Sequence, residues 1–299
     1  MEDKDVGPPP GPPPLLPEDE LISLARQGWV SLPRSQSLDR MVSSLFKTAS
    51  EFFDLPAEDK ARLYPSKQGT EFGYYRVSDE KEYATLRCHV HGESALERDA
   101  AQVWEASALL LHRALYDVAR ARHLPISVWD DILDGTLTLP KNEQEMTYTL
   151  LRLFRYFPAS GFAAEHTDLG LLTICFGKGQ GLQVMDFSLP SPTWVDVDGP
   201  VILAGQTLRA LSRGVIRAGL HRVVGNPQGR SSIVFALRHS SRHEIDLKAF
   251  GGQGTVHPRL LWNRIRVGKV NINAVKEIRE EQRAKLDSCN QGSEVPGHG

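Results

Sequence analysis

A predominantly antiparallel β fold, a sandwich or jelly roll preceded by α-helices, is the fold class that the sequence predicts. Apolar residues recur at helical spacing between about residues 18 and 133. From about residue 146 the period changes to two, or to short continuous apolar runs separated by turn residues. Many short strands with no helices between them are typical of antiparallel sandwiches and jelly rolls.

The chain begins with a proline-rich segment. Residues 1–17 include the run GPPPGPPPLLP, in which proline removes backbone donors and glycine loosens the chain. We therefore expect a disordered leader over 1–17. A partner that recognises polyproline is the alternative use of this segment, and no protein partner can be deduced from it.

Residues 18–145 are predicted to be mostly helical. The apolar positions that carry this prediction are Leu38, Met41, Val42, Leu45, Phe46 and Ala49, followed by Leu96, Ala100, Val103, Trp104 and Leu111. The exception is Trp29–Leu32, a short strand-like run that follows Gly28. It predicts that the first strand of the sheet comes before the helices.

Residues 146–270 are predicted to form the jelly-roll core. The expected strands are Thr147–Phe157, Leu171–Phe176, Leu182–Met185, Trp194–Val197, Val201–Ala204 and Ser231–Leu237. An amphipathic, charged helix is expected over 273–287, and a disordered tail over 288–299. The whole stretch 18–287 is predicted to be a single catalytic domain.

The composition excludes several classes of partner. The 35 Lys and Arg residues nearly balance the 37 Asp and Glu residues, so a formal net charge of -2 provides no field for nucleic acid or an anionic membrane. No apolar stretch approaches the roughly 18 residues that span a bilayer. Cys88, Cys175 and Cys289 are widely separated, which fits reduced thiols rather than a disulfide framework. We expect a cytoplasmic protein.

A possible metal site lies in residues 165–170, which read EHTDLG. In an extended strand the side chains of His166 and Asp168 point to one face and can reach one ion, while Thr167 faces away. Such a pair is common by chance. A second pair of this kind, His91-Gly92-Glu93, occurs in the helical half without a downstream partner.

The distal residue that completes the set is His221, in the segment LHRVVGNPQGRSS. Two histidines and one carboxylate on adjacent strands form the facial triad of non-haem iron sites, which leaves coordination positions open for chemistry. A lone histidine at a strand end is more often satisfied by a backbone carbonyl, so His221 alone would not carry this interpretation.

Arg230 and Ser232 form another pair with side chains on one face of a strand. A guanidinium fork beside a hydroxyl suits a dianionic co-substrate, because arginine binds a carboxylate through two hydrogen bonds. In isolation Arg230 would more simply be a solvated arginine after the turn at 226–229. Together with His166, Asp168 and His221, it indicates an oxygenase.

At this point the chain resembles the isopenicillin N synthase-like 2-oxoglutarate/Fe(II)-dependent dioxygenases over most of residues 18–270. The pieces that carry the resemblance are RQGWVSLP, EFFDLPAEDKARLY, GYY, KEYATLR, LRLFRYFP, HTDLGLLTICF, GLQVMD, WVDVDGPVILAGQTLRALSRG, LHRVV and GRSSIVFALR. The resemblance implies a distorted double-stranded β-helix with the N-terminal helices packed outside it and the active site in its mouth.

The resemblance also implies the cofactors and their ligands. His166, Asp168 and His221 would bind Fe(II), and Arg230 and Ser232 would bind the distal carboxylate of 2-oxoglutarate. O2 would be the oxidant and ascorbate a reductant.

Two further positions match the family only in part. Tyr156 matches a tyrosine that often contacts the co-substrate, although Phe154-Arg155 replace the asparagine usually found ahead of it. Gly205-Gln206 stands where many relatives carry Gly-Asp, and we expect a turn there.

The reaction that follows is the oxidation, by hydroxylation or desaturation, of a small organic substrate with release of succinate and CO2. By the family's layout, the segment 69–93 lies near the mouth of the site, which makes Tyr74, Tyr75 and Arg87 candidate substrate contacts. Two alternatives remain: an Fe(II) oxidase of the same fold that does not use 2-oxoglutarate, and a non-catalytic binding module.

Overall fold

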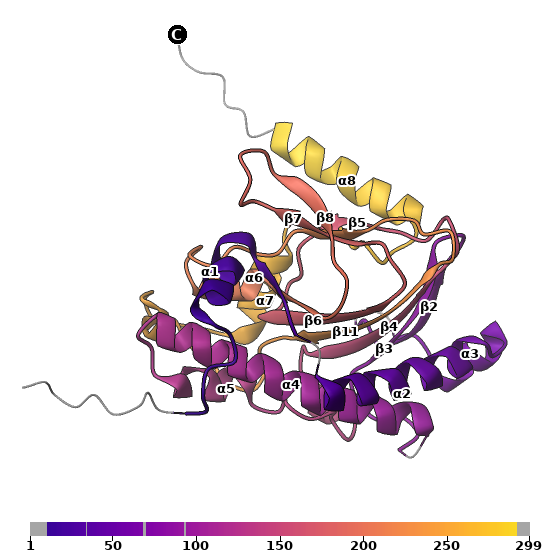
Figure 1. The fold of residues 1–299 in the computed structure, drawn as a ribbon, viewed down its shortest axis with the longest axis horizontal. Helices are drawn as coiled ribbons and strands as arrows, with labels where there is room; N and C mark the ends of the chain where they lie inside the picture. Colours follow the sequence, from indigo (N-terminus) through magenta and orange to yellow (C-terminus); the bar gives the residue numbers. More distant parts are fainter. Residues whose placement is uncertain (1–10, 34, 68–69, 93, 292–299) are drawn as a thin grey trace, which may run out of the picture.

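Two antiparallel sheets form the centre of the protein (Figure 1). The computed structural model describes residues 11–33, 35–67, 70–92 and 94–291. The larger sheet has the order β1-β9-β6-β11-β4-β3-β2, and the smaller has the order β5-β10-β7-β8. The predicted fold class, mainly β with N-terminal helices, is confirmed.

The strands of the larger sheet are β1 (Trp29–Ser31), β2 (Gly73–Val77), β3 (Lys81–Leu86), β4 (Leu150–Tyr156), β6 (Leu172–Lys178), β9 (Val201–Ala204) and β11 (Arg230–Leu237). The strands of the smaller sheet are β5 (Ala163–His166), β7 (Leu182–Asp186), β8 (Thr193–Asp196) and β10 (His221–Val223). A separate pair consists of β12 (Ile245–Asp246) and β13 (Thr255–Val256). All six strands expected beyond residue 146 are present, and β1 confirms the early strand.

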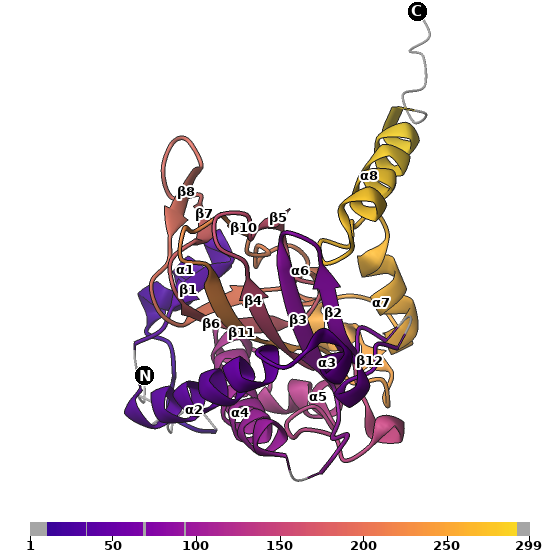
Figure 2. The ribbon, with the colours of Figure 1, turned by 90° about the vertical axis from the view of Figure 1, so that its right-hand side faces the viewer.

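The α-helices are α1 (Glu18–Gln27), α2 (Gln36–Phe53), α3 (Ala57–Leu63), α4 (Ala95–Ala121), α5 (Asp130–Leu133), α6 (Gln206–Leu211), α7 (Pro258–Arg266) and α8 (Lys276–Gln291). Short 3-10 turns cover Ile126–Trp129, Glu143–Glu145 and Lys248–Phe250. The long helices α2 and α4 lie side by side beneath the larger sheet in Figure 1. In Figure 2 the end of α8 extends away from the body of the protein.

Both faces of the larger sheet are buried, each against a different part of the protein. On its outer face Phe235 of β11 meets Trp104 of α4, with ring centroids 5.1 Å apart. Most of the apolar residues predicted to form the faces of α2 and α4 are buried in this outer core. The inner face lies against the smaller sheet and carries Tyr83, Phe154 and Tyr156 together with a second apolar cluster. Because strand residues alternate between faces, polar residues at every second position also point inward.

Strands from both halves of the chain share this one sheet, since β3 pairs with β4 along its length. The hairpin β2–β3 was not predicted. It lies in the half expected to be mostly helical, and its register places Tyr75 opposite Tyr83. Helices α6 and α7 were likewise not expected within the jelly-roll core.

Two predicted boundaries are wrong. Leu16 of the predicted leader is 3% exposed, and the backbone N–H groups of Leu15 and Leu16 donate to Asp117 Oδ2 at 2.8 and 2.9 Å. Buried apolar area and two hydrogen bonds to a carboxylate stabilise this short stretch against the entropy of the leader. At the other end, α8 continues to Gln291, so the tail cannot begin at 288. Residues 1–10 and 292–299 lie outside the described residues.

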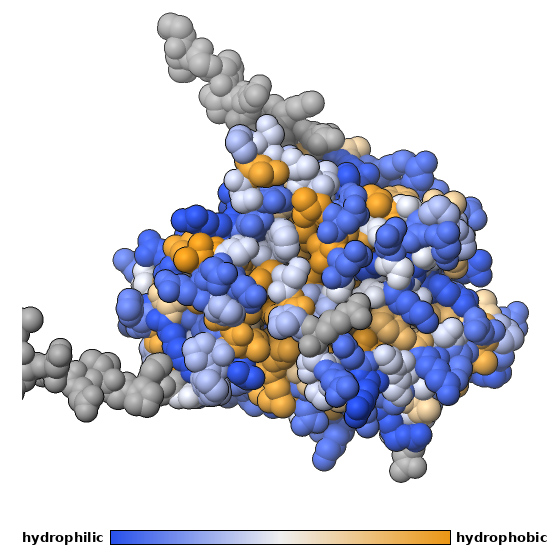
Figure 3. All heavy atoms as spheres, viewed as in Figure 1, coloured by the Kyte–Doolittle hydropathy of each residue, from blue (hydrophilic) through white to orange (hydrophobic). Residues whose placement is uncertain are grey.

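The surface in Figure 3 mixes hydrophilic with hydrophobic residues. Within the described part of the chain, no helix combines the length and apolar character needed to cross a bilayer.

Candidate metal and co-substrate site

His166 and His221 lie opposite each other on neighbouring strands. His166 is the last residue of β5 and His221 the first of β10, and the two are register partners with ring centroids 4.1 Å apart. Asp168 follows β5 by two residues. One potential ligand atom from each of His166, Asp168 and His221 lies within 4.8 Å of the others. The structure therefore brings the three predicted metal ligands together.

The backbone sets the tautomer of both imidazoles. His166 Nδ1 lies 2.7 Å from the carbonyl oxygen of Ala164, and His221 Nδ1 lies 3.1 Å from that of Gly219. A carbonyl only accepts, so each Nδ1 carries the proton and each Nε2 presents a lone pair. The two Nε2 atoms lie 3.8 and 3.9 Å from Asp168 Oδ1, longer than hydrogen bonds. This donor set fits a divalent metal ion, because metal-binding histidines commonly donate their other N–H to a carbonyl.

The electrostatics of the cluster also suit a cation. Burial lowers the pKa of His166, and the neighbouring His221 lowers it further, so His166 is neutral near pH 7. Burial alone would raise the pKa of Asp168, but His221, His166 and the Thr173 hydroxyl outweigh it and lower the pKa. A neutral His166 and an ionised Asp168 can bind an ion without first losing a proton.

Arg230 and Ser232 lie on the inner face of β11. Arg230 is 6% exposed, and its Nε donates to Ser232 Oγ at 3.0 Å, while Nη1 contacts the carbonyl of Gly179. The guanidinium lies directly against Gly177, where a Cβ would overlap Nη2. Within the described residues no carboxylate forms a salt bridge with Arg230, and burial lowers its pKa. A buried guanidinium without an acidic partner fits the carboxylate of a co-substrate.

Tyr156 of β4 is the register partner of Arg230, and only 5% of its surface is exposed. Burial raises its pKa, so the phenol is neutral. Tyr156 thus lies beside the predicted carboxylate-binding pair, as expected of a co-substrate contact.

Comparison with known proteins supports the expected family. The model of the 2OG-Fe(II) oxygenase superfamily matches residues 148–239, the segment that contains the whole cluster. Over this segment the chain is similar to the 2OG-Fe(II) oxygenase superfamily. The expected cofactors, Fe(II) and 2-oxoglutarate, and the expected enzyme class, a 2-oxoglutarate/Fe(II)-dependent dioxygenase, are thereby confirmed.

Curated relatives match this oxygenase at low identity. The 2-oxoglutarate-dependent dioxygenase ecdG of Aspergillus rugulosus is 28% identical over 70% of this chain and 70% of its own length. Flavanone 3-dioxygenase 3 of Oryza sativa subsp. japonica is 28% identical over 68% of this chain and 66% of its own length. The oxygenase thus spans about two thirds of the length of these relatives.

Solved structures share its fold. A full-length Neurospora crassa protein, in complex with alpha-KG and 5-formyluracil, has a TM-score of 0.65 and 20% identity over 83% of this chain and 88% of its own. A putative 2OG-Fe(II) oxygenase family protein from Caulobacter crescentus has a TM-score of 0.68 and 21% identity over 84% and 93%. The expected double-stranded β-helix is confirmed as the fold of the oxygenase.

The three predicted substrate contacts lie in different places. Tyr75 stacks on Tyr83 on the inner face, with centroids 5.1 Å apart. Tyr74 points outward: its hydroxyl donates to Glu82 at 2.6 Å and its ring packs on Phe52. The prediction for Tyr74 is wrong, because neighbouring strand residues face opposite sides of a sheet.

Arg87, at the end of β3, donates from its two terminal nitrogens to the backbone carbonyls of Thr70 and Thr147. Burial and, to a smaller extent, the neighbouring Arg238 lower the pKa of Arg87 to about 10. Arg87 therefore belongs to a group of basic residues on the inner face.

Sequence reasoning missed several inward-facing basic residues of the oxygenase. Lys81 is fully buried, its Nζ donates to the carbonyls of Phe162 and Ile272 at 3.2 and 3.3 Å, and burial lowers its pKa to about 7. Arg152 and Arg238 also lie on this face. The available signal for Arg152 was its even spacing from Tyr156 in LRLFRY, which places both side chains on one face once that segment is read as a strand.

Other sequence features have structural roles. Gly205 caps α6, so the expected turn is the start of a helix. The amide of Gln206 donates to Thr167 Oγ1 at 2.6 Å and its backbone N–H to the Asp168 carbonyl at 2.8 Å, which positions the Asp168 segment. The second His-x-carboxylate pair places His91 Nε2 on the Leu63 carbonyl, away from the triad.

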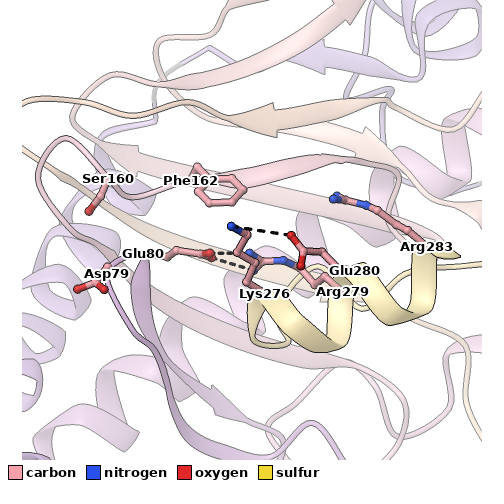
Figure 4. A pocket seen from close by; sticks show the side chains of 8 residues that line it. All are labelled: Asp79, Glu80, Ser160, Phe162, Lys276, Arg279, Glu280 and Arg283. Carbon is pink, nitrogen blue, oxygen red and sulfur yellow. Dashed lines mark hydrogen bonds and ion pairs between the residues drawn. The ribbon is translucent and has the colours of Figure 1, made fainter.

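A pocket of about 380 Å³ lies apart from the triad, between α8 and the turns that precede β3 and β5 (Figure 4). The three acidic and three basic residues that line the pocket balance in charge: Asp79, Glu80, Glu280, Lys276, Arg279 and Arg283. The pocket lies where α8 contacts the body of the oxygenase, and none of the triad residues lines it.

Proposed function

We propose that this oxygenase holds Fe(II) through His166, Asp168 and His221 and oxidises a small organic molecule with 2-oxoglutarate as co-substrate. The observation that carries the proposal is the convergence of two Nε2 lone pairs on the Asp168 carboxylate. When bound, the iron and 2-oxoglutarate supply the oxidation of a C–H bond coupled to formation of succinate and CO2.

The chain contributes orientation and charge. The bonds from His166 Nδ1 and His221 Nδ1 to backbone carbonyls hold the rings so that both lone pairs point inward. Asp168 supplies the negative charge, and three ligands leave coordination positions open for co-substrate and oxygen. Ligands fixed in this way need little rearrangement when the ion binds.

Arg230 and Ser232 hold the distal carboxylate of 2-oxoglutarate in this proposal, with Tyr156 as a neighbouring contact. Because Arg230 already donates to Ser232, guanidinium and hydroxyl are oriented as one unit before the anion arrives. The apolar side chains Val184, Leu203 and Val223 belong to the inner cluster and limit the access of water. Exclusion of water strengthens the ion pair.

Anaerobic titration of the full chain with Fe(II) and 2-oxoglutarate tests the proposal. We expect the weak visible charge-transfer band of the chelate, its loss in His166→Ala, and a shift to higher 2-oxoglutarate concentration in Arg230→Ala. Oxygen consumption without succinate would favour the oxidase alternative, in which Arg230 and Ser232 bind a different carboxylate. Absence of both the band and oxygen consumption would favour the binding module.

We also propose a cytoplasmic location. Cys88 and Cys175 are buried free thiols, which fits a compartment that keeps cysteines reduced. Fractionation of cells that express the full chain tests this, and recovery from an oxidising compartment would contradict it.

A further inference from the structure

A second basic cluster lies on the inner face of the larger sheet, at the other end from Arg230. Arg238 follows β11 directly, and its even spacing from Arg230 places both side chains on one face. Arg152 of β4 shares this face, since its Nε donates to Thr85 Oγ1 at 2.8 Å. Arg87 is close to the same group. We call Arg87, Arg152 and Arg238 the distal arginine cluster.

The distal arginine cluster is close to the metal-binding residues. The Thr173 hydroxyl lies beside Asp168, and Thr173 is the register partner of Ala236 on β11. Arg238 is only two residues beyond Ala236, about 7 Å along the strand. A small molecule held by Arg238 can therefore extend to the level of Asp168.

One carboxylate currently occupies this cluster. Glu71 Oε1 lies 3.2 Å from Arg152 Nη2, and Glu71 Oε2 lies 2.7 Å from Arg238 Nη1. The arginine side chains are only 10% and 8% exposed. Among the described residues, Glu71 is the acid that forms ion pairs with this cluster, and Arg87 donates to backbone carbonyls rather than to a carboxylate. Buried positive charge thus exceeds negative charge.

Glu71 has the features of a replaceable ligand. Its side chain keeps 42% of its surface exposed, although both of its partners are buried. Its backbone has a φ of 59°, a left-handed conformation that is unfavourable for a residue with a side chain. The buried Nε of Arg238 has no hydrogen-bond partner in the described structure. An incoming anion could take over the contacts of Glu71 and use this free donor.

We propose that Arg152 and Arg238 bind a carboxylate of the substrate in exchange for Glu71, so that the substrate is a small organic acid. The two oxygens of Glu71 already show how one carboxylate divides between the two guanidiniums. The reaction on such an acid rests on the function proposed above. The binding itself requires neither iron nor oxygen.

The surroundings of Arg152 indicate an apolar or aromatic body for this acid. The Arg152 guanidinium lies over the rings of Tyr83 and Phe154, 5.4 and 5.9 Å from their centroids. Tyr75 stacks on Tyr83 and extends the aromatic surface. The carboxylate would meet the arginines, and the apolar body would follow these rings along the inner face.

Isothermal titration calorimetry on the full, metal-free chain tests the proposal. The probes are phenylacetate, benzoate and octanoate, and phenylacetamide is the neutral counterpart of the first. Saturating 2-oxoglutarate is present throughout, so that Arg230 is occupied. We expect phenylacetate to bind at least about tenfold more tightly than phenylacetamide. Equal binding of the two, or no binding of any of the three acids, would overturn the proposal.

Variants assign the contact to these residues. We expect Arg152→Gln and Arg238→Gln to weaken phenylacetate binding about tenfold or more, Arg238→Lys to weaken it less, and Glu71→Gln to tighten it by removing the competing carboxylate. Arg76→Gln is the matched control, because Arg76 is an exposed arginine on neighbouring β2. Thermal unfolding identifies any variant that fails to fold, and Arg238→Lys retains the charge in that case.

The results separate the two proposals. Suppose that the wild type shows no charge-transfer band with iron and 2-oxoglutarate but still binds phenylacetate in a way that depends on the two arginines. That result would overturn the proposed function alone. A normal band with unchanged acid binding in Arg152→Gln and Arg238→Gln would overturn only the substrate inference. Weaker acid binding in Glu71→Gln would also overturn it, because the exchange requires the opposite sign.

Discussion

Arg279 and Glu80 form a two-fold ion pair that joins the C-terminal helix to the β2–β3 turn. Arg279 Nη1 donates to Glu80 Oε2 at 2.8 Å, and Nη2 contacts Oε1 (Figure 4). The Arg279 side chain is 3% exposed and that of Glu80 is 10% exposed. The guanidinium also lies 5.2 Å from the ring of Phe162, which leads into β5 and His166.

We predict that Arg279→Ala loosens α8 by leaving Glu80 as a buried charge without a partner. Removal of one partner of a buried ion pair costs about 3 to 5 kcal/mol. Trypsin should therefore cleave within 276–286 more than tenfold faster than in the wild type. Arg283→Ala is the control, since Arg283 is exposed on the same helix. Equal cleavage rates for Arg279→Ala and Arg283→Ala would show that the ion pair does not hold α8.

We predict that His166→Ala, Asp168→Ala or His221→Ala abolishes turnover and lowers iron affinity, because two ligands remain. Folding should survive, since each residue lies at or beyond the end of a short strand. Iron content and thermal unfolding of each variant provide the measurements. A variant that retained both iron and activity would remove that residue from the proposed set.

Arg230→Ala should raise the 2-oxoglutarate concentration needed for half-maximal rate, with little change in the iron requirement. A charge-assisted hydrogen bond contributes about 1.5 to 3 kcal/mol, or roughly ten- to hundredfold. Arg230→Lys should restore only part of this, because an ammonium lacks the planar fork. Unchanged dependence on 2-oxoglutarate would instead favour the oxidase alternative.

Gly177→Ala provides an independent test of the same contact. A Cβ at this position would overlap Arg230 Nη2, so the guanidinium must move. We predict a higher 2-oxoglutarate requirement without any change in the ligands themselves. Gly199→Ala is the control, because nothing lies within 4 Å of the Cβ that alanine would add there. The positive φ of Gly199 makes a modest loss of stability expected in this control. Unaltered co-substrate use in Gly177→Ala would contradict the placement of Arg230.

The predictable part of the site came from residues spaced two apart on one strand. The sequence alone pairs His166 with Asp168 and Arg230 with Ser232, because strand geometry fixes which side chains share a face. His221 was the less direct inference, made from its place in the segment LHRVVGNPQGRSS, since β10 has only three residues and no strong apolar run. Periodicity identifies long apolar strands far better than short ones.

Arg152 and Arg238 of the distal arginine cluster could not be predicted because their contacts are long-range. Glu71 and Arg238 are 167 residues apart in the sequence, and no local pattern pairs them. The hairpin β2–β3 was missed for a related reason. Buried Lys81 and Glu82 interrupt its alternation, and only the neighbouring strand and helices make their burial possible. Local propensity carries no information about such partners.

We predict that a buried histidine makes the protein sensitive to acid. His239 is fully buried, its Nε2 lies 3.2 Å from the Pro258 carbonyl, and burial lowers its pKa to about 4. The unfolded chain therefore binds a proton near pH 6.5 that the folded chain does not bind until about pH 4. Stability is retained above pH 6.5 and should fall by on the order of 3 kcal/mol between pH 6.5 and 4.

Urea unfolding of the wild type and His239→Gln at several pH values measures this contribution. Because His239→Gln cannot titrate, its stability should fall less steeply over this range, even if it is lower at pH 8. Parallel pH profiles of stability for the two proteins would show that His239 does not cause the loss of stability in acid.

Residues 15–16 at the N-terminus should matter for stability, unlike the disordered leader that composition predicts. Leu16 is 3% exposed within the main core, and its backbone N–H bonds the Asp117 carboxylate of α4. We predict that Leu16→Ala lowers the free energy of unfolding by about 2 to 4 kcal/mol, the usual cost of truncating a buried leucine. Ile22→Ala is a matched control, because Ile22 is 44% exposed and should change stability by less than about 1 kcal/mol. Deletion of residues 1–16 should then be as damaging as Leu16→Ala or more so, whereas deletion of residues 1–10 leaves Leu16 and its contacts in place. Equal stability of the wild type and the 1–16 deletion in urea unfolding would restore the disordered leader as the correct description.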